Sequence, residues 1–248
     1  MTAHDPISPA TRAEAADSRP SPEGSESPKA AARSELSRRG TLRSPRAWLT
    51  LLVPFACSLA LDLWSKAWAF RTVAGAPVEL RRDEIAGNPS YELPRHQGVS
   101  VLPWDLLDFH LVLNHGAVFG LGSGRRSVFV AFTIIAACVA LWVFARLTAA
   151  KDTLAHIGLG LVLAGGIGNL VDRIFFGAVR DFLHMLPRWH LPFNLRWPGG
   201  NPEVFPWVFN VADVSLLSGM AILLVVLNRR GEPAGVPPAR SSPEASAR

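Results

Sequence analysis

The chain has 248 residues, of which 49% are hydrophobic, and its mean hydropathy is positive at +0.21. A net charge of +5 and a pI near 10 would suit a nucleic-acid binder. The chain also has long apolar runs, so its basic residues are more typical of a membrane protein that contacts anionic lipid headgroups. We therefore expect no nucleic-acid partner. The two cysteines, Cys57 and Cys138, lie far apart in apolar sequence, which argues against a disulfide framework or a thiolate metal site.

The first 45 residues are rich in Ser, Pro, Ala, Glu and Arg, a composition typical of disorder. Residues 229–248 have the same character, so we expect disordered tails at 1–45 and 229–248 around one membrane domain at 46–228. The polar lead is too long for the n-region of a cleaved signal peptide. The first apolar run is therefore predicted to be a retained signal-anchor helix.

Four apolar runs follow, at about 47–70, 128–147, 154–176 and 209–227. Each is near the roughly 20 residues that a helix needs to cross a ~30 Å hydrocarbon core, and lipid forces such runs to be helical. Core helices of a soluble protein are the alternative, but residues 128–143 contain no charged side chain and so offer no face suited to water. The predicted fold is an all-α membrane protein, a four-transmembrane-helix bundle, with a small extracytoplasmic β-rich segment around 99–112.

Basic residues before the first run and after the last favour cytoplasmic positions for both termini. An even number of helices then places the loops 71–127 and 173–208 on the outer side. Arginines in these loops weaken the charge bias, so charge alone gives only a preferred orientation.

Polar residues of the apolar runs gather at their predicted outer ends. An ionisable side chain in a membrane segment costs roughly 2.5–3.5 kcal/mol on insertion scales, so its presence is a functional-site hypothesis. Two carboxylates brought together there, Asp181 and Asp213, would be sufficient for acid/base activation of a water molecule. The other members of the set are Asp62, Lys66, Asn114, Gly116, Asn169, Asp172, Arg173 and Asn210.

Each of these residues also has a simpler interpretation. Asp62 and Lys66 are four apart on one helix face and could form only an interfacial ion pair. Asn210 could be the N-cap of the last helix, with Asp213 in its first turn. The chain has no HExxH motif and no Gly-flanked serine beside a histidine, so zinc and serine hydrolase mechanisms are not indicated.

Five motifs in order strengthen the active-site interpretation. From 61 to 227 the chain resembles lipoprotein signal peptidase (signal peptidase II), a family of bacterial inner-membrane aspartic proteases. The motifs are Asp62-Leu-Trp-Ser-Lys66, Asn114-His-Gly-Ala-Val-Phe119, Gly165-Gly-Ile-Gly-Asn-Leu-Val-Asp-Arg173, Gly177-Ala-Val-Arg-Asp-Phe182 and Phe209-Asn-Val-Ala-Asp213.

The resemblance implies the chemistry. Asp181 and Asp213 correspond to the catalytic pair, whereas Asp172 does not, and Phe193-Asn194 lacks the Ala-Asp that would complete the last motif. It also implies a monomer without cofactor or metal, with its site near the extracytoplasmic face. The implied substrates are diacylglyceryl-modified prolipoproteins, cleaved before the lipidated cysteine. The implied site-lining residues are Asp62, Lys66, Asn114, Gly116, Asn169, Arg173 and Asn210.

Three features depart from the family pattern: Arg180 before the first catalytic aspartate, Val214 after the second, and a longer loop between them. Three other functions are alternatives. A prepilin- or presenilin-like protease would carry Gly-x-Gly-Asp, which this chain lacks. A proton-coupled transporter would show mid-membrane ionisable residues and internal repeats, and neither is visible. A non-enzymatic membrane scaffold is the third.

Overall fold

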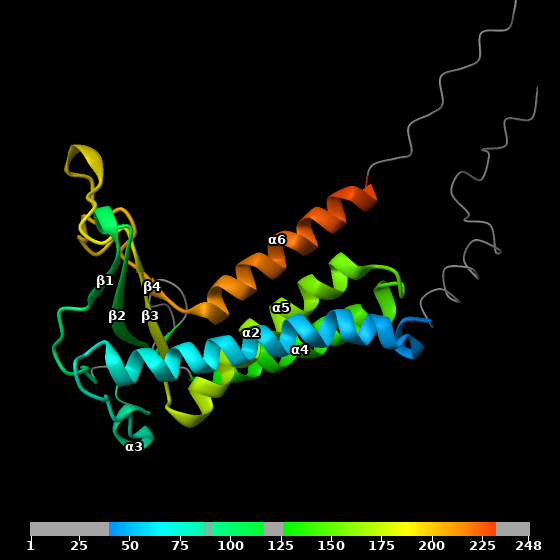
Figure 1. Cartoon of the computed structure of the whole chain (residues 1–248), viewed down its shortest axis with the longest axis horizontal. Helices are drawn as coiled ribbons and strands as arrows, with labels where there is room; N and C mark the ends of the chain where they lie inside the picture. Colours follow the sequence, from blue (N-terminus) through cyan, green and yellow to red (C-terminus); the bar gives the residue numbers. More distant parts are fainter. Residues whose placement is uncertain (1–39, 87, 89–90, 117–125, 232–248) are drawn as a thin grey trace, which may run out of the picture.

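The computed structural model describes residues 40–86, 88, 91–116 and 126–231. Long helices run along the long axis, and a small sheet lies across one end (Figure 1). Most of the two tails predicted to be disordered lies outside the described residues, so that prediction stays a prediction. The elements in chain order are α2 (Pro45–Thr72), α3 (Arg82–Ile85), β1 (Val99–Leu102), η1 (Pro103–Asp105), β2 (Leu107–Asn114), α4 (Arg126–Leu147), α5 (Thr153–Phe175), β3 (Val179–Met185), η3 (Pro192–Asn194), β4 (Val208–Phe209) and α6 (Val211–Gly231).

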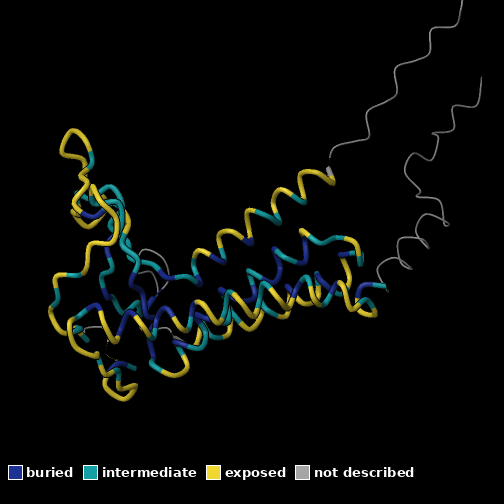
Figure 2. Tube along the Cα trace, in the orientation of Figure 1, coloured by how far each residue is buried: buried dark blue, intermediate teal, exposed yellow. Residues whose placement is uncertain are grey.

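Four helices in the described part of the chain, α2, α4, α5 and α6, are long and apolar enough to cross a membrane. This confirms the predicted four-helix plan. The start of α2 and the end of α6 both lie at the end of the bundle away from the sheet (Figure 1). Figure 2 shows exposed residues along the outer sides of the long helices, where apolar side chains such as Phe132 and Leu217 would meet lipid.

The label "all-α" is imprecise, because β1, β2, β3 and β4 form an antiparallel sheet in that order. The β-rich segment expected at 99–112 corresponds to β1 and most of β2. The strands β3 and β4 were not expected. The last helix begins at Val211 rather than at 209, because Phe209 pairs with Leu183 in the sheet.

α5 is the central helix: 56% of the residues in its most apolar stretch are buried, against 17% or less in the other three long helices. Glycines let its neighbours approach closely. A Cβ at Gly165 would lie 2.3 Å from the carbonyl oxygen of Ala212, and one at Gly168 would lie 2.4 Å from Asp62 Oδ2. The carboxylate of Asp62 on α2 therefore occupies the space that a side chain at position 168 would fill.

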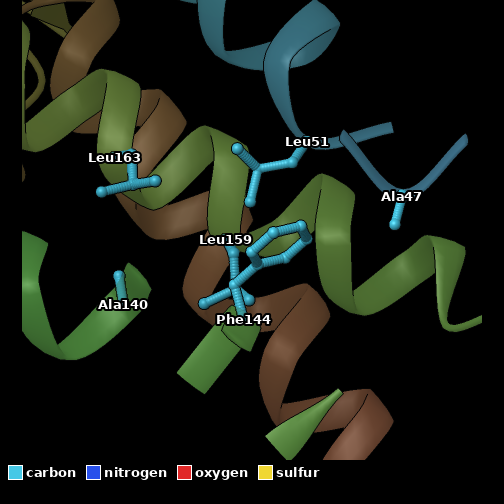
Figure 3. Close-up of a cluster of buried hydrophobic side chains, with 6 residues drawn as sticks. All are labelled: Ala47, Leu51, Ala140, Phe144, Leu159 and Leu163. Atoms are coloured by element: carbon cyan, nitrogen blue, oxygen red, sulfur yellow. The ribbon is translucent and has the colours of Figure 1, made fainter. Parts of the chain in front are cut away.

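Two apolar clusters hold the fold together. One joins α2, α4 and α5 (Figure 3), and it consists of Ala47, Leu51, Ala140, Phe144, Leu159 and Leu163. The other joins the end of α2 to β2 and β3, and it consists of Ala69, Phe70, Val73, Leu111 and Phe182. The second cluster fixes the sheet against the helix ends, so that residues of β2 and β3 meet residues of α5 and α6.

Candidate active site

Asp181 lies on β3, and Asn114 lies at the end of the neighbouring strand β2. Asp181 pairs with Val112, so Asn114, two residues further along β2, points to the same face of the sheet. Asn114 Nδ2 donates a hydrogen bond of 3.1 Å to Asp181 Oδ2. The backbone N–H of Gly116 donates to Asn114 Oδ1 at 3.0 Å, which orients this amide with its NH₂ group toward the carboxylate.

The sequence places Asp181 just past the end of the third helix, and in the structure α5 ends at Phe175. What was not expected is that a tight turn leads from there into a strand, β3, which carries Asp181. Gly177 adopts φ +88°, and a Cβ there would lie 2.9 Å from that of Ala86. Only glycine fits this turn without strain, and the turn brings Asp181 back over the helix ends.

Asp213 is held by the N-terminus of α6. Asn210 Oδ1 accepts a hydrogen bond from the backbone N–H of Asp213, and Asp213 Oδ2 accepts one from the backbone N–H of Asn210, both at 3.1 Å. This reciprocal pair is a capping box, and the helix dipole favours a carboxylate there. The cap does not exclude a place in the site, because Asn210 Nδ2 also donates to Asp181 Oδ1 at 2.5 Å. One asparagine thus contacts both carboxyl groups.

Asn169 of α5 completes the set of amides around the two carboxyl groups. Its Nδ2 donates to Asp213 Oδ1 at 2.8 Å. Its Oδ1 accepts from Asn210 Nδ2 at 3.1 Å and from Lys66 Nζ at 3.0 Å. These partners fix the direction of the Asn169 amide, so that its NH₂ group faces Asp213.

Lys66 and Asp62 of α2 lie next to the Asn169 amide, and both are fully buried. Their ion pair is 2.8 Å long, and Asp62 Oδ1 also accepts from the backbone N–H of Ala212 at 2.8 Å. The ion pair expected from their spacing is present, and it is buried inside the protein. They link α2 to the first turn of α6 and to Asn169.

The Asp172 carboxylate is paired with two cations, Arg180 and Lys66. Arg180 donates to Asp172 Oδ1 through Nη2 at 2.7 Å and Nε at 3.1 Å, and its backbone N–H donates to Oδ2 at 3.0 Å. Lys66 Nζ lies 3.3 Å from the same carboxylate. The Arg180 guanidinium also lies over the ring of Phe176, 4.2 Å from its centroid. The sequence shows Arg180 only as a departure from the family pattern, and its spacing from Asp172 does not indicate the pair.

Arg173 ties α5 to the segment after β2. Its Nη2 donates to the carbonyl oxygen of Gly116 at 2.9 Å, and its Nη1 donates to that of Asn169 at 3.4 Å. The pair Phe193-Asn194, which lacks the Ala-Asp of the last motif, lies in the loop between β3 and β4, outside the hydrogen-bond network that the described residues form here. The structure thus connects all nine residues proposed for the site: Asp62, Lys66, Asn114, Gly116, Asn169, Arg173, Asp181, Asn210 and Asp213.

The two carboxyl groups differ in their surroundings. Asp181 is buried, whereas Asp213 is partly exposed. Burial, and then the negative charge of Asp213, raise the pKa of Asp181 to about 8. At neutral pH Asp181 therefore retains a proton. The described residues contain no group of three or more His, Cys, Asp or Glu side chains arranged to hold a metal ion.

Comparison with known proteins gives the family of the chain. Residues 55–229, more than half of the chain, match the family model described as signal peptidase (SPase) II. The chain belongs to the signal peptidase II family. Its membership makes it a membrane peptidase, and the matched residues include every member of the polar network.

Curated relatives in this family are named lipoprotein signal peptidase. The protein from Dichelobacter nodosus is 32% identical over 185 residues, which are 72% of this chain and 94% of the relative. That from Aquifex aeolicus is 34% identical over 163 residues, covering 64% of this chain and 85% of the relative. That from Rhodopseudomonas palustris is 39% identical over 140 residues, covering 54% and 75%.

Two solved structures of bacterial membrane enzymes share the fold. One, solved by the in meso method at 2.3 Å, gives a TM-score of 0.54 at 22% identity and covers 76% of this chain and 94% of the other. The second, solved by the same method at 1.9 Å, gives a TM-score of 0.51 at 22% identity, with 72% and 92% covered. At this identity the likeness extends to the fold alone.

Proposed function

We propose that this member of the signal peptidase II family is an intramembrane aspartic endopeptidase. Its substrates are diacylglyceryl-modified prolipoproteins, and it hydrolyses the peptide bond before the lipidated cysteine to release the signal peptide. The observation that carries the proposal is that one residue, Asn210, contacts two carboxyl groups: its side-chain Nδ2 donates to Asp181 of β3, and its backbone N–H donates to Asp213 of α6.

The difference in burial supports different roles for the two groups. Two carboxyl groups linked through one asparagine can share one proton, which the group in the more buried position holds. The partly exposed Asp213 is the ionised member, which water can reach. The buried Asp181, with its raised pKa, is the protonated member. Asn114, Asn169 and Asn210 hold the two groups in position before substrate arrives.

Hydrolysis then proceeds without a covalent intermediate. Asp213 takes a proton from water as the water oxygen bonds to the scissile carbonyl carbon, while Asp181 gives its proton to the carbonyl oxygen. The resulting gem-diol collapses as the C–N bond breaks. Asp213 passes its proton to the leaving nitrogen, and Asp181 recovers a proton from a gem-diol hydroxyl. The products are a carboxylic acid and the free amine of the lipidated cysteine, and the pair returns to its starting state.

The location of the site suits this substrate. The network lies where the sheet meets the helix ends, so water can approach from outside while acyl chains remain in lipid. We place the protein in the bacterial inner membrane, with both termini cytoplasmic and the site near the extracytoplasmic face. The basic flanks Arg43, Arg46, Arg229 and Arg230 support this orientation, since cytoplasmic flanks are typically basic.

The test is cleavage of a lipidated prolipoprotein by purified protein. Asp181→Asn and Asp213→Asn should each lower turnover by at least about a thousandfold, because each removes one partner in proton transfer. Asp83→Asn, on an exposed carboxylate of α3, is the matched control and should retain normal turnover. Activity within about tenfold of wild type in either dyad variant, with the fold intact by circular dichroism, would overturn the assignment.

A further inference from the structure

A cluster of exposed aromatic side chains lies at the end of the sheet away from the helices. We call it the aromatic lobe, defined as residues 103–106 and 186–207, which are the segment before β2 and the loop after β3. Trp104 is 79% exposed and Phe193 is 93% exposed, although such side chains are normally at least half covered. Further exposed apolar residues of the lobe are Trp189, Leu195 and Trp197.

Two turns of the same kind present the most exposed rings. Each has the sequence Pro-aromatic-Asx, with both the aromatic and the Asx residue in the left-handed region. Trp104 and Asp105 have φ values of 58° and 56°, and Phe193 and Asn194 have 59° and 55°. This conformation is costly for a bulky side chain. Strained backbone that holds two large rings outward is unfavourable in water and favours an apolar surrounding for these rings.

Hydrogen bonds, ion pairs and ring packing hold the lobe in one conformation. Trp189 Nε1 donates to the carbonyl oxygen of Trp104 at 2.9 Å and so links the loop to the turn. Arg188 pairs with Asp105 and also donates to Asp108 at 2.8 Å. Within the loop, the rings of Trp197 and Trp207 pack edge to face, with centroids 4.8 Å apart. The exposed rings therefore belong to a fixed surface, which lowers the entropy lost when that surface binds.

The position of the lobe suggests its surroundings. α2 has 28 residues and is about 42 Å long, close to the ~40–45 Å thickness of a bilayer with its headgroups. The sheet crosses the bundle where α2 ends, and the yellow loop projects to the side of the bundle rather than along its axis (Figure 1). If α2 spans the bilayer with its headgroups, the lobe lies beside the bundle at the level of the lipid headgroups. Tryptophan rings prefer that level, and the exposed Arg196, whose Nη1 donates to the carbonyl oxygen of Gly200, would place a cation near anionic phosphates.

We propose that the aromatic lobe is a membrane anchor that inserts the rings of Trp104 and Phe193 into the outer-leaflet interface next to the helix bundle. The occupant of this surface is the phospholipid of the membrane that the four helices cross. The anchor holds the loop between β3 and β4 flat against the bilayer. The inference requires only that the helices cross a membrane, and it goes beyond the proposed hydrolysis.

The test measures the depth of a nitroxide label. The full chain, with Cys57→Ala and Cys138→Ala, is labelled at Phe193→Cys and reconstituted in vesicles of phosphatidylethanolamine and phosphatidylglycerol. Power-saturation EPR then compares accessibility to oxygen and to a water-soluble nickel chelate. Labels at Leu217→Cys and Arg82→Cys give the lipid and water references, because Leu217 is an exposed apolar residue of α6 and Arg82 an exposed cation of α3.

The anchor predicts a label at 193 that is protected from the chelate and lies roughly 5–10 Å below the headgroup boundary. A ratio equal to that of the Arg82 reference would overturn the proposal, and a lobe that binds another protein instead would give that result in these vesicles. A second label at Leu195→Cys tests the rings themselves. Combining Trp104→Ser with Phe193→Ser should raise its chelate accessibility severalfold, whereas unchanged accessibility would show that the rings are not the anchor.

Discussion

Replacing Arg180 by methionine tests the buried charge network beneath the proposed dyad. The change keeps an unbranched apolar stem but removes the guanidinium and its two hydrogen bonds to Asp172, a pair whose side chains are only 9% and 0% exposed. Removing one partner of a buried ion pair costs about 3–5 kcal/mol, because the other charge stays buried. Lys66, at 3.3 Å, and the backbone N–H of residue 180 still face Asp172. We therefore expect the lower end, about 3 kcal/mol, or more than a hundredfold in the unfolding constant.

The assay is reversible unfolding in mixed micelles by titration with a denaturing detergent, followed by circular dichroism. Arg81→Met is the matched control, since the Arg81 side chain is 65% exposed and its surface pairs should contribute less than about 1 kcal/mol. Adding Asp172→Asn to Arg180→Met should recover part of the loss, because no unpaired charge is then buried. Two results would refute the reasoning: a loss for Arg180→Met no larger than for Arg81→Met, or a double variant equal to the sum of the two single variants.

Three further predictions follow from the same contacts. Because the pKa of Asp181 rises from 3.8 to about 8 on folding, the folded state binds more protons than the unfolded state between these pH values. Turnover should therefore fall as pH rises past about 8. The midpoint of thermal unfolding of the wild type should also fall between pH 6 and 9, and it should fall less steeply in Asp181→Asn. Gly168→Ala places a Cβ 2.4 Å from Asp62 Oδ2 and should destabilise the protein by about 1–3 kcal/mol in the same detergent titration, whereas equal stability would show that the helices can separate freely. An engineered cysteine at the exposed Glu92, in a background without Cys57 and Cys138, should react with an impermeant reagent in spheroplasts, and reaction only after permeabilisation would reverse the proposed orientation.

Local signals in the sequence were enough to predict the helices and one half of the candidate site. The apolar runs identify the spans, because lipid leaves the backbone no alternative to a helix. Asn210 and Asp213 carry the spacing of a helix cap, and the structure has that cap. Asp62 and Lys66 share a helix face by their spacing alone, and they do pair.

The other half of the site depends on contacts between distant segments. After Phe176 the chain turns into β3 instead of continuing as a helix. This turn packs Gly177 against Ala86, which is far away in sequence. The strand that carries Asp181 was therefore not predicted. The bond between Arg180 and Asp172 spans the same corner, so neither residue indicates its partner by spacing. The left-handed turns at Trp104 and Phe193 were also missed, since aromatic residues rarely adopt that conformation.

The origin of the two carboxyl groups in different parts of the chain sets the order in which the candidate site is built on the ribosome. Asp181 emerges with β3, but Asn210 and Asp213 belong to the start of α6, the last described helix to be synthesised. A nascent chain that has inserted α2, α4 and α5 holds one carboxyl group of the pair, without the asparagine that contacts both. The pair forms only when α6 docks beside α5 and Ala212 donates to Asp62. If Asp181 and Asp213 are the proposed catalytic pair, a chain that ends before α6 has no complete site and should be inactive.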